Sequence, residues 1–288
     1  MSQNAKNHTR SKLAAIMPTR RDIHFDLAAE RIGDWNKGSV HLSQFMNTLS
    51  IFFPVGERFF IDSVRYYRDR ITDPELKKAV TAFIGQEAMH GREHEQYNQL
   101  TFARTPVSAK VETFVYHLLE GAKKRLPPSM RLSGTIALEH FTALMADSLL
   151  NEPRMLEGAE PHYARIWNWH ALEETEHKAV AYDVWDAVMG RGAKAYFNRA
   201  SGMVIATTIF WSIMIPAYLM VLRQEGQLGN VKGWRFLMRN LFTEIPFFPR
   251  LARSYLDYFR PDFHPWDHDN RQFLKHIDTY LNELPQAA

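Results

Sequence analysis

Residues 169–178 read Trp-His-Ala-Leu-Glu-Glu-Thr-Glu-His-Lys, and residues 86–94, earlier in the chain, read Gln-Glu-Ala-Met-His-Gly-Arg-Glu-His. Each stretch contains Glu-x-x-His, which pairs Glu87 with His90 and Glu174 with His177. On a helix, side chains three positions apart lie on one face, about one turn from each other. A carboxylate oxygen and an imidazole nitrogen placed in this way can bind the same metal ion. The repeated pattern therefore predicts two helices that each present a pair of metal ligands.

An isolated glutamate precedes each of these pairs. Glu57 stands within Phe-Phe-Pro-Val-Gly-Glu-Arg-Phe-Phe-Ile (residues 52–61), and Glu139 within Gly-Thr-Ile-Ala-Leu-Glu-His-Phe-Thr-Ala-Leu (residues 134–144). A carboxylate in such an apolar stripe is costly to bury unless a metal ion, a partner charge or a proton compensates it. Dinuclear four-helix bundles take one Glu from each of two helices and Glu-x-x-His from each of the other two. We therefore predict two metal ions held by Glu57, Glu87, His90, Glu139, Glu174 and His177. The alternative is a bundle with several buried, paired carboxylates.

Two further histidines, His94 and His170, lie on the ligand-bearing faces, one helical turn from a ligand. Each is a candidate for an additional ligand, for a hydrogen-bond partner of a ligand or for a proton-transfer group. His140 follows Glu139 and points about 100° away around the helix, so we do not expect it to bind metal. We expect four neighbouring glutamates to face solvent or to pair with nearby side chains: Glu93, Glu95, Glu173 and Glu176.

The composition limits the chemistry and the partners of this 288-residue chain. It contains no cysteine, so disulfides and thiolate metal sites are both excluded. Carboxylate and imidazole ligands suit iron, manganese or zinc, and iron is the expected metal. The net charge is +3 without a long run of like charge, so a nucleic-acid partner is not expected. The N-terminus is polar and basic and lacks the apolar segment of a signal peptide, which predicts a cytoplasmic location.

Three of the quoted segments resemble a known bacterial family. They are residues 53–57 (Phe-Pro-Val-Gly-Glu), residues 86–94 and residues 169–178. Over roughly residues 17–260 the chain is similar to the predicted metal-dependent hydrolases, which in turn resemble the ferritin-like di-iron carboxylate superfamily. Position by position, the resemblance implies the same six ligands, with His94 and His170 near them. It also implies an all-α fold, namely a ferritin-like four-helix bundle with additional C-terminal helices.

Hydrophobic periodicity and turn signals divide the chain into three parts. Residues 1–36 form an N-terminal extension, in which His24 is expected to be a surface or packing residue. Residues 37–190 form the metal-binding bundle, and residues 191–288 form C-terminal helices packed on it. Pro54 is expected either to kink or to break the first of the bundle helices. These helices are predicted over residues 39–69, 74–100, 108–125, 128–150 and 160–189.

The C-terminal part begins with an unusual segment, because residues 203–222 contain no charged side chain. Twenty such residues can span a bilayer. A helix that dips into a membrane or faces the substrate, and a plain core helix, are the two other interpretations. Residues 232–253 mix Trp, Phe and Leu with Arg, which suits either an interfacial helix or a helix packed on the bundle. Peripheral membrane contact through residues 203–255 is therefore an expectation, as is a dimer. The cluster of His264, Asp267, His268 and Asp269 has the composition of turns, and we do not expect a second metal site there.

From this ligand set we expect a non-haem di-iron oxidase or oxygenase that uses dioxygen and an electron donor. The apolar segment 203–222 suggests an apolar, lipid-like small molecule as the substrate. One alternative is a metal-dependent hydrolase in which a zinc-, manganese- or iron-bound hydroxide is the nucleophile. The other is a ferritin-like protein that oxidises or binds iron.

Overall fold

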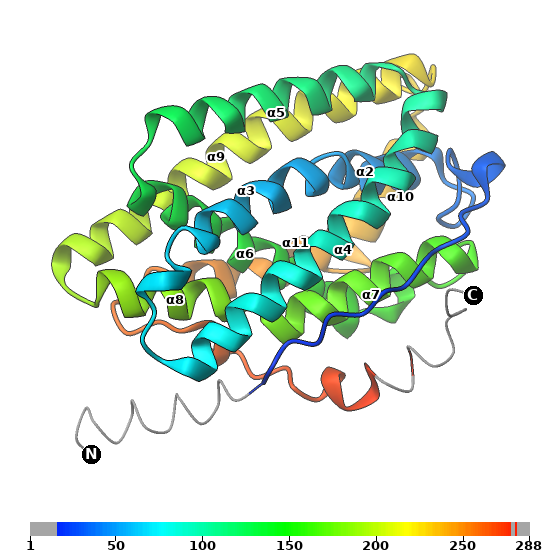
Figure 1. Cartoon of the computed structure of the whole chain (residues 1–288). Coiled ribbons are helices and arrows are strands. Elements are labelled where there is room, and N and C mark those ends of the chain that lie inside the picture. The colour runs from blue at the N-terminus through cyan, green and yellow to red at the C-terminus, as the bar shows by residue number, and fades with distance from the viewer. Residues whose placement is uncertain (1–15, 278–279, 281–288) are drawn as a thin grey trace.

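The computed structural model describes residues 16–277 and residue 280, and it is built from α-helices (Figure 1). Within these residues no β-strand occurs. Residues 1–15, the first part of the predicted N-terminal extension, lie outside the described part of the chain. With the labels of Figure 1, the helices are α2 (Val40–Ser50), α3 (Phe53–Arg65), α4 (Pro74–Arg104), α5 (Val107–Arg125), α6 (Pro128–Asn151), α7 (Pro161–His177), α8 (Val180–Met189), α9 (Ala193–Gln224), α10 (Val231–Met238) and α11 (Phe247–Asp257).

Local sequence signals explain where the two helices with Glu-x-x-His begin. The side chain of Asp73 accepts hydrogen bonds from the backbone N–H groups of Glu75 and Leu76, at 2.8 and 3.3 Å. Pro74 follows Asp73 in the first turn of α4, where its missing N–H group leaves no hydrogen bond unmade. Glu160 caps α7 in the same way. These caps fix the start of each helix and hence the register of its ligands.

Two of the predicted long helices are each broken in two. The helix predicted over residues 39–69 is α2 followed by α3, and Pro54 lies in the first turn of α3. Proline is favoured at that position, so Pro54 begins a helix here and does not kink one. The helix predicted over residues 160–189 is α7 followed by α8, with Lys178 and Ala179 between them. Gly190 ends α8 with a φ of +67°, a conformation that favours glycine.

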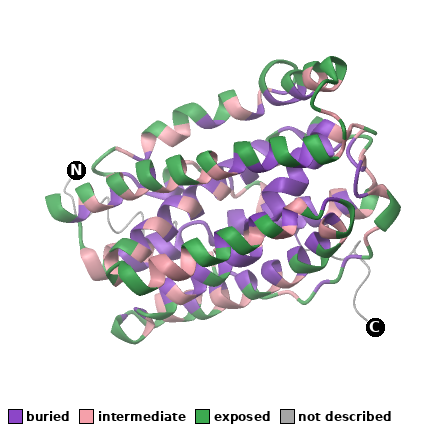
Figure 2. Ribbon diagram, turned by 90° about the horizontal axis from the view of Figure 1, so that it is seen from above, coloured by how far each residue is buried: buried purple, intermediate pink, exposed green. Residues whose placement is uncertain are grey.

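The helices α3, α4, α6 and α7 surround the interior of the molecule. Helix α3 contacts α4, α4 contacts α7, α7 contacts α6 and α6 contacts α3, so the four close a ring. Their buried faces point inward, as Figure 2 shows. Two apolar clusters fill the interior along the length of the ring. One is rich in aromatic residues and includes Phe45, Trp167 and Trp169, and the other includes Phe59, Phe83 and Trp185. The predicted ligands lie where these two clusters meet.

Helix α9 is longer than the uncharged segment predicted over residues 203–222, and it lies on the outside of the ring. It contacts α2, α5 and α6 along one face, which buries Met203, Met214 and Leu222. Its opposite face is exposed, with Val204 and Ile215 each more than half accessible to solvent. By length and composition α9 is the one described helix that could cross a membrane, which alone is weak evidence for a span. Helix α9 is therefore neither a plain core helix nor a helix separate from the fold.

Candidate metal centre

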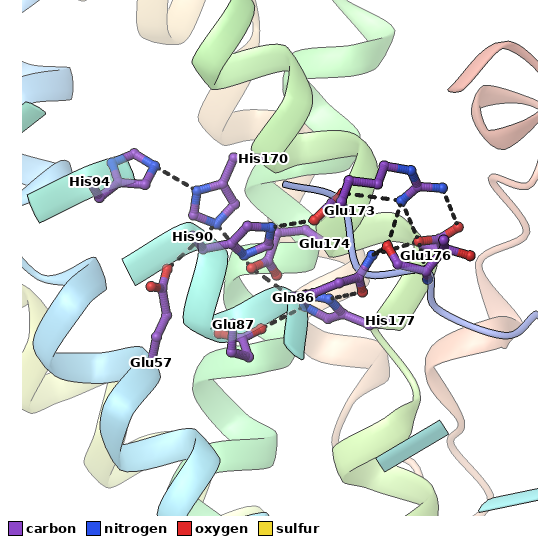
Figure 3. Close-up of polar contacts among 12 residues, drawn as sticks. Glu57, Gln86, Glu87, His90, His94, His170, Glu173, Glu174, Glu176 and His177 are labelled. Atoms are coloured by element: carbon purple, nitrogen blue, oxygen red, sulfur yellow. Dashed lines mark hydrogen bonds and ion pairs between the residues drawn. The ribbon is translucent and has the colours of Figure 1, made fainter. Parts of the chain in front are cut away.

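Six side chains from the four helices of the ring converge where the two apolar clusters meet, and Figure 3 shows five of them: Glu57, Glu87, His90, Glu174 and His177. Helix α3 supplies Glu57, α6 supplies Glu139, and α4 and α7 each supply one Glu and one His. His177 Nε2 lies 2.9 Å from a carboxylate oxygen of Glu87, 3.6 Å from one of Glu174 and 3.7 Å from one of Glu139. The structure thus brings together all six predicted ligands: Glu57, Glu87, His90, Glu139, Glu174 and His177.

The donor atoms form two groups that share no residue. In one group, ligand atoms of Glu57, His90 and His170 all lie within 4.8 Å of one another, and in the other group those of Glu87, Glu139 and His177 do so. A third combination of His90 with Glu87 and Glu174 lies between them. All these side chains are buried. Two separate groups with shared donors between them match two adjacent metal ions.

The carboxylate oxygens of this cluster have almost no protein partners. Among the described residues, no hydrogen bond reaches any oxygen of Glu57, Glu87 or Glu139. Such orphaned oxygens are rare in a folded interior, because each one costs free energy when it is buried without a partner. Two divalent cations would supply both the missing partners and the four positive charges that balance four carboxylates. The residues present therefore fit a dinuclear metal site.

The pKa values of the carboxylates also show that their negative charges are not balanced by the protein. Burial, together with the charges of Glu87, Glu174 and Glu139, holds the pKa of Glu57 well above its ordinary value. Burial likewise raises the pKa of Glu139. Burial would also raise the pKa of Glu174, but the imidazoles of His177 and His170 outweigh it and lower that pKa. Without a cation, burial and mutual repulsion therefore favour the protonated forms of Glu57 and Glu139.

Outside the cluster, hydrogen bonds fix which nitrogen of His90 and of His177 faces inward. Nε2 of His90 donates to Glu173 at 3.0 Å, which leaves the lone pair of its unpartnered Nδ1 free. Nδ1 of His177 donates to the amide oxygen of Gln86 at 3.0 Å, and the amide nitrogen of Gln86 donates to Glu176 at 2.6 Å. Nε2 of His177 consequently faces the carboxylates, 2.9 Å from Glu87. Metal-binding histidines are commonly oriented by such partners.

Arg21 joins the two arms of this network. Its guanidinium donates to Glu173 at 3.1 Å and to both oxygens of Glu176, at 2.8 and 3.0 Å. The extended segment that carries Arg21 runs across α4 and α7, and the backbone N–H group of Thr19 also donates to Glu176. Even so, burial raises the pKa of Glu173 to about 8, despite the charge of Arg21. One arginine thus holds the two carboxylates that orient ligands on both sides of the centre.

This network refines the prediction for three glutamates. Glu173, Glu176 and Glu93 were expected either to face solvent or to pair with neighbouring side chains; all three are buried, and each pairs with an arginine, Arg21 or Arg92. Glu93 accepts the backbone N–H group of Phe25 at 3.1 Å and lies within ion-pair distance of the exposed His24. The N-terminal segment covers this side of α4 and α7 and excludes water, which periodicity along a single helix does not reveal. Glu95, by contrast, is half exposed and pairs with Arg58, as expected.

The two additional histidines have different positions. Asn98 directs its amide N–H group to the backbone carbonyl of Ser50, so its amide oxygen accepts the Ser50 hydroxyl at 2.7 Å. Because the Ser50 hydroxyl already donates its proton, Ser50 Oγ must accept from Nδ1 of His94, at 2.8 Å. The proton of His94 therefore lies on Nδ1, and its Nε2 accepts from Nδ1 of His170, at 2.7 Å. Both nitrogens of His94 are therefore occupied. The other nitrogen of His170, Nε2, forms a hydrogen bond with Glu174 at 3.1 Å and lies 3.9 Å from Glu57. His170 is positioned as a seventh ligand, and His94 as the group that orients it.

A cavity of about 230 Å³ leads away from the centre between α5, α6 and α9. Glu57 and Glu174 lie at its inner end, beside the hydroxyl of Thr142, which donates to Glu174 at 2.7 Å. Most of the wall is apolar and includes Phe52 and Phe141. The volume exceeds that of an engineered apolar cavity of about 150 Å³ that accepts benzene. The centre is therefore accessible to an apolar molecule.

The remaining histidine clusters lie outside the centre. His140 is buried and packs on Tyr258, with its Nε2 3.3 Å from the backbone carbonyl of Ser254, so it points away from the ligands as expected. Burial lowers its pKa to about 3. In the C-terminal tail, the side chains of His264 and Asp267 form a capping box around a short helical turn. This agrees with the interpretation of that cluster as turn composition.

Residues 19–269 match the family of predicted metal-dependent hydrolases, and the chain belongs to that family. This match covers most of the chain and contains every residue of the centre described above. A search of curated proteins and a search of solved structures each found no match.

Proposed function

We propose that the chain is a metal-dependent hydrolase whose dinuclear centre acts on an apolar small molecule held in the 230 Å³ cavity. One observation carries the proposal: an apolar cavity ends at Glu57, whose buried carboxylate has no hydrogen-bond partner among the described residues, and at the neighbouring Glu174. The family supports the reaction class. Two divalent ions, when bound, would polarise the bond to be cleaved and lower the pKa of the attacking water.

The arrangement of the ligands supports a ferritin-like bundle as the structural type. Helices α3 and α6 each supply one Glu, and α4 and α7 each supply Glu-x-x-His, which is the pattern of dinuclear four-helix proteins. The residues that would hold the metals are Glu57, Glu87, His90, Glu139, Glu174, His177 and, in addition, His170. Arg21, Gln86, Glu173 and His94 would hold the imidazoles in place.

The cavity also limits where the substrate reacts. Glu57, Glu174 and Thr142 are the polar groups at its inner end, whereas aromatic and aliphatic side chains line the remainder near the centre. A substrate must therefore place its polar, cleavable group beside Glu57 and Glu174 and its apolar tail toward α5 and α9. Medium-chain esters are the simplest molecules of this shape.

The test is hydrolysis of 4-nitrophenyl octanoate by the metal-loaded protein under argon, with metal content measured on the same sample. We expect about two metal ions per chain and turnover that requires neither oxygen nor reductant. Glu87→Ala and Glu174→Ala should lose both metal and turnover, whereas Glu95→Ala, on an exposed residue of α4, should keep both. Full metal content in the first two variants would refute the site.

Oxidation by dioxygen is the second candidate. The observation that favours it is the combination of a carboxylate-rich donor set with a largely apolar cavity, which excludes water from reactive species. It predicts two irons per chain, an absorption change when the anaerobic reduced protein meets oxygen, and no ester hydrolysis under argon. Zinc or manganese that persists after expression in excess iron, without any oxygen-dependent band, would instead favour hydrolysis.

A further inference from the structure

The face formed by α5 and α9 carries the largest group of exposed apolar side chains in the described chain. On α9 it contains Phe197, Val204 and Ile215, each more than half exposed, with Leu219 also accessible. These positions lie within about 60° of one another around the helix, at 100° per residue. They form a stripe about 33 Å long, at 1.5 Å per residue. Helix α5 lies alongside α9 on the same side of the molecule (Figure 1).

The cavity that reaches the metal centre opens on this face. Its lining includes Leu118 of α5, Leu126 directly after α5, and Ile205 and Ile209 of α9, and all four side chains are exposed at the surface as well. At its other end the same cavity contacts Glu57 and Glu174. A molecule that leaves an apolar phase covering this face would thus enter the cavity without crossing water.

The charges at the ends of the face favour a lipid surface as its occupant. Helices α5 and α9 run antiparallel, since the N–H group of Val107, which begins α5, is bonded to Gln224, which ends α9. Exposed basic side chains stand at both ends of the pair: Lys110 and Arg223 at one end, and Lys124, Arg125 and Lys194 at the other. The acidic side chains of α5 reduce this positive charge only slightly, because Glu120 pairs with Lys123 and Glu112 is partly buried.

A second copy of the chain fits this face poorly. Both ends of the face are basic, so a copy laid on it in either direction would place cations against cations. The composition of α9 agrees with this, because its charged side chains are Lys194, Arg199 and Arg223 and none is acidic. An anionic bilayer supplies both the apolar phase and the negative charge that such a surface requires.

Helix α9 lies along the fold and is held there by polar contacts as well as by packing. The guanidinium of Arg199 donates to the backbone carbonyls of Tyr258 and Arg260. Further along the helix, the Tyr218 hydroxyl donates to the carbonyl of His41 at 2.9 Å. A span across the bilayer would break these buried bonds, whereas a helix that lies in the interface keeps them.

We propose that the α5–α9 face binds the surface of an anionic membrane and that the cavity takes its substrate, a molecule with a hydrocarbon tail, directly from the bilayer. The second half of the proposal rests on the proposed function. The first half does not, because membrane binding requires only the surface of α5 and α9.

Flotation with vesicles tests the first half. The metal-free full-length protein is mixed with vesicles of phosphatidylcholine and phosphatidylglycerol at 7:3, or of phosphatidylcholine alone. We expect binding to the anionic vesicles that weakens in high salt. Val204→Glu and Ile215→Glu lie outside the cavity and should each weaken it about tenfold. Met17→Glu, an exposed apolar residue on the N-terminal segment, is the matched control and should bind like the parent chain.

The proposal would be overturned if Val204→Glu and Ile215→Glu bound anionic vesicles as strongly as Met17→Glu does. It would also be overturned if the parent chain bound neither kind of vesicle. A dimer in gel filtration that Val204→Glu converts to a monomer, without vesicle binding, would assign the face to a second copy of the chain. Ile209→Trp separates the two halves, because it should block the mouth of the cavity. We expect this variant to bind vesicles normally but to lose the thermal stabilisation that 1-octanol gives the parent protein. Undiminished stabilisation by 1-octanol would refute entry through this mouth, whether or not the protein is a hydrolase.

Discussion

Replacing Glu57 by Gln should change the stability of the metal-free and the metal-loaded protein in opposite directions. Both carboxylate oxygens of Glu57 are buried without a hydrogen-bond partner among the described residues, and three other carboxylates repel its charge. Because burial and these charges raise the pKa of Glu57, folding at neutral pH must either keep its charge in the interior or take up a proton, and a pKa change of one unit corresponds to about 1.4 kcal/mol. The amide of Gln needs neither, so the metal-free variant should be more stable than the parent chain by at least about 1 kcal/mol.

The metal-loaded protein should respond in the opposite way. A ligand at about 1,000 times its Kd stabilises the folded state by about 4 kcal/mol. Glutamine is a poor metal ligand compared with a carboxylate, so the ion near Glu57 should contribute little in the variant. For a chain of this length, 1 kcal/mol corresponds to roughly 2 °C in Tm. Metal should therefore raise the Tm of the parent chain by about 8 °C for each ion bound. The rise for Glu57→Gln should be smaller by about 8 °C, the contribution of one ion.

The assay is thermal unfolding of both proteins in a chelator and in a series of metal concentrations. Glu95→Gln is the control, because Glu95 lies on α4 but is half exposed and pairs with Arg58. It should leave both Tm values unchanged. The argument would be refuted if Glu57→Gln lowered the Tm in chelator, or if metal stabilised the variant as much as the parent chain.

Three further predictions concern the surroundings of the centre. Arg21→Leu leaves two buried carboxylates unpaired, so chemical denaturation should show that the free energy of unfolding falls by about 3 kcal/mol. Metal titration of this variant should show a 10- to 100-fold weaker affinity. The control Arg20→Leu, at an exposed position, should change neither quantity. In Gly202→Ala the new methyl group would lie 2.0 Å from Ser133 Oγ and 3.1 Å from its carbonyl oxygen, so we expect a loss of about 1–2 kcal/mol in the same denaturation experiment; a variant as stable as the parent would contradict the close packing of α6 and α9. Burial lowers the pKa of His41 below the value of about 6.5 expected for the unfolded chain. As the pH falls, the unfolded state therefore takes up the proton first, and stability falls below about pH 6.5. The Tm of His41→Gln should fall less than that of the parent chain between pH 7 and pH 5, and parallel Tm curves would refute this.

The sequence predicted the parts of the centre that depend on helical spacing. Glu87 with His90 and Glu174 with His177 stand three residues apart, and a helix places such pairs on one face whatever it packs against. Glu57 and Glu139 were found because a charged residue in an apolar stripe is unusual. The start of a helix at Pro74 followed from a local signal, proline in the first turn after Asp73. Each of these signals lies within one or two turns of chain.

The sequence left open whether Pro54 kinks or breaks the first bundle helix, and it did not predict the break at residues 178–179, because apolar periodicity continues across it. It also missed the partners that orient the ligands. Arg21 and Glu176 are 155 residues apart, and nothing near either one signals their contact. Their burial depends on the N-terminal segment lying across two helices, which is a property of the assembled fold.

Local spacing and composition thus determined an all-α chain with six ligand positions and an uncharged segment near residue 210. Only the tertiary structure decided which histidine nitrogens face the centre, because their orientation depends on partners from other helices. It also decided the role of α9. An apolar helix can be buried or exposed, and the choice depends on the neighbours that cover it. Here α6 covers one side of α9 and leaves the other side open, beside the mouth of the cavity that ends at Glu57 and Glu174.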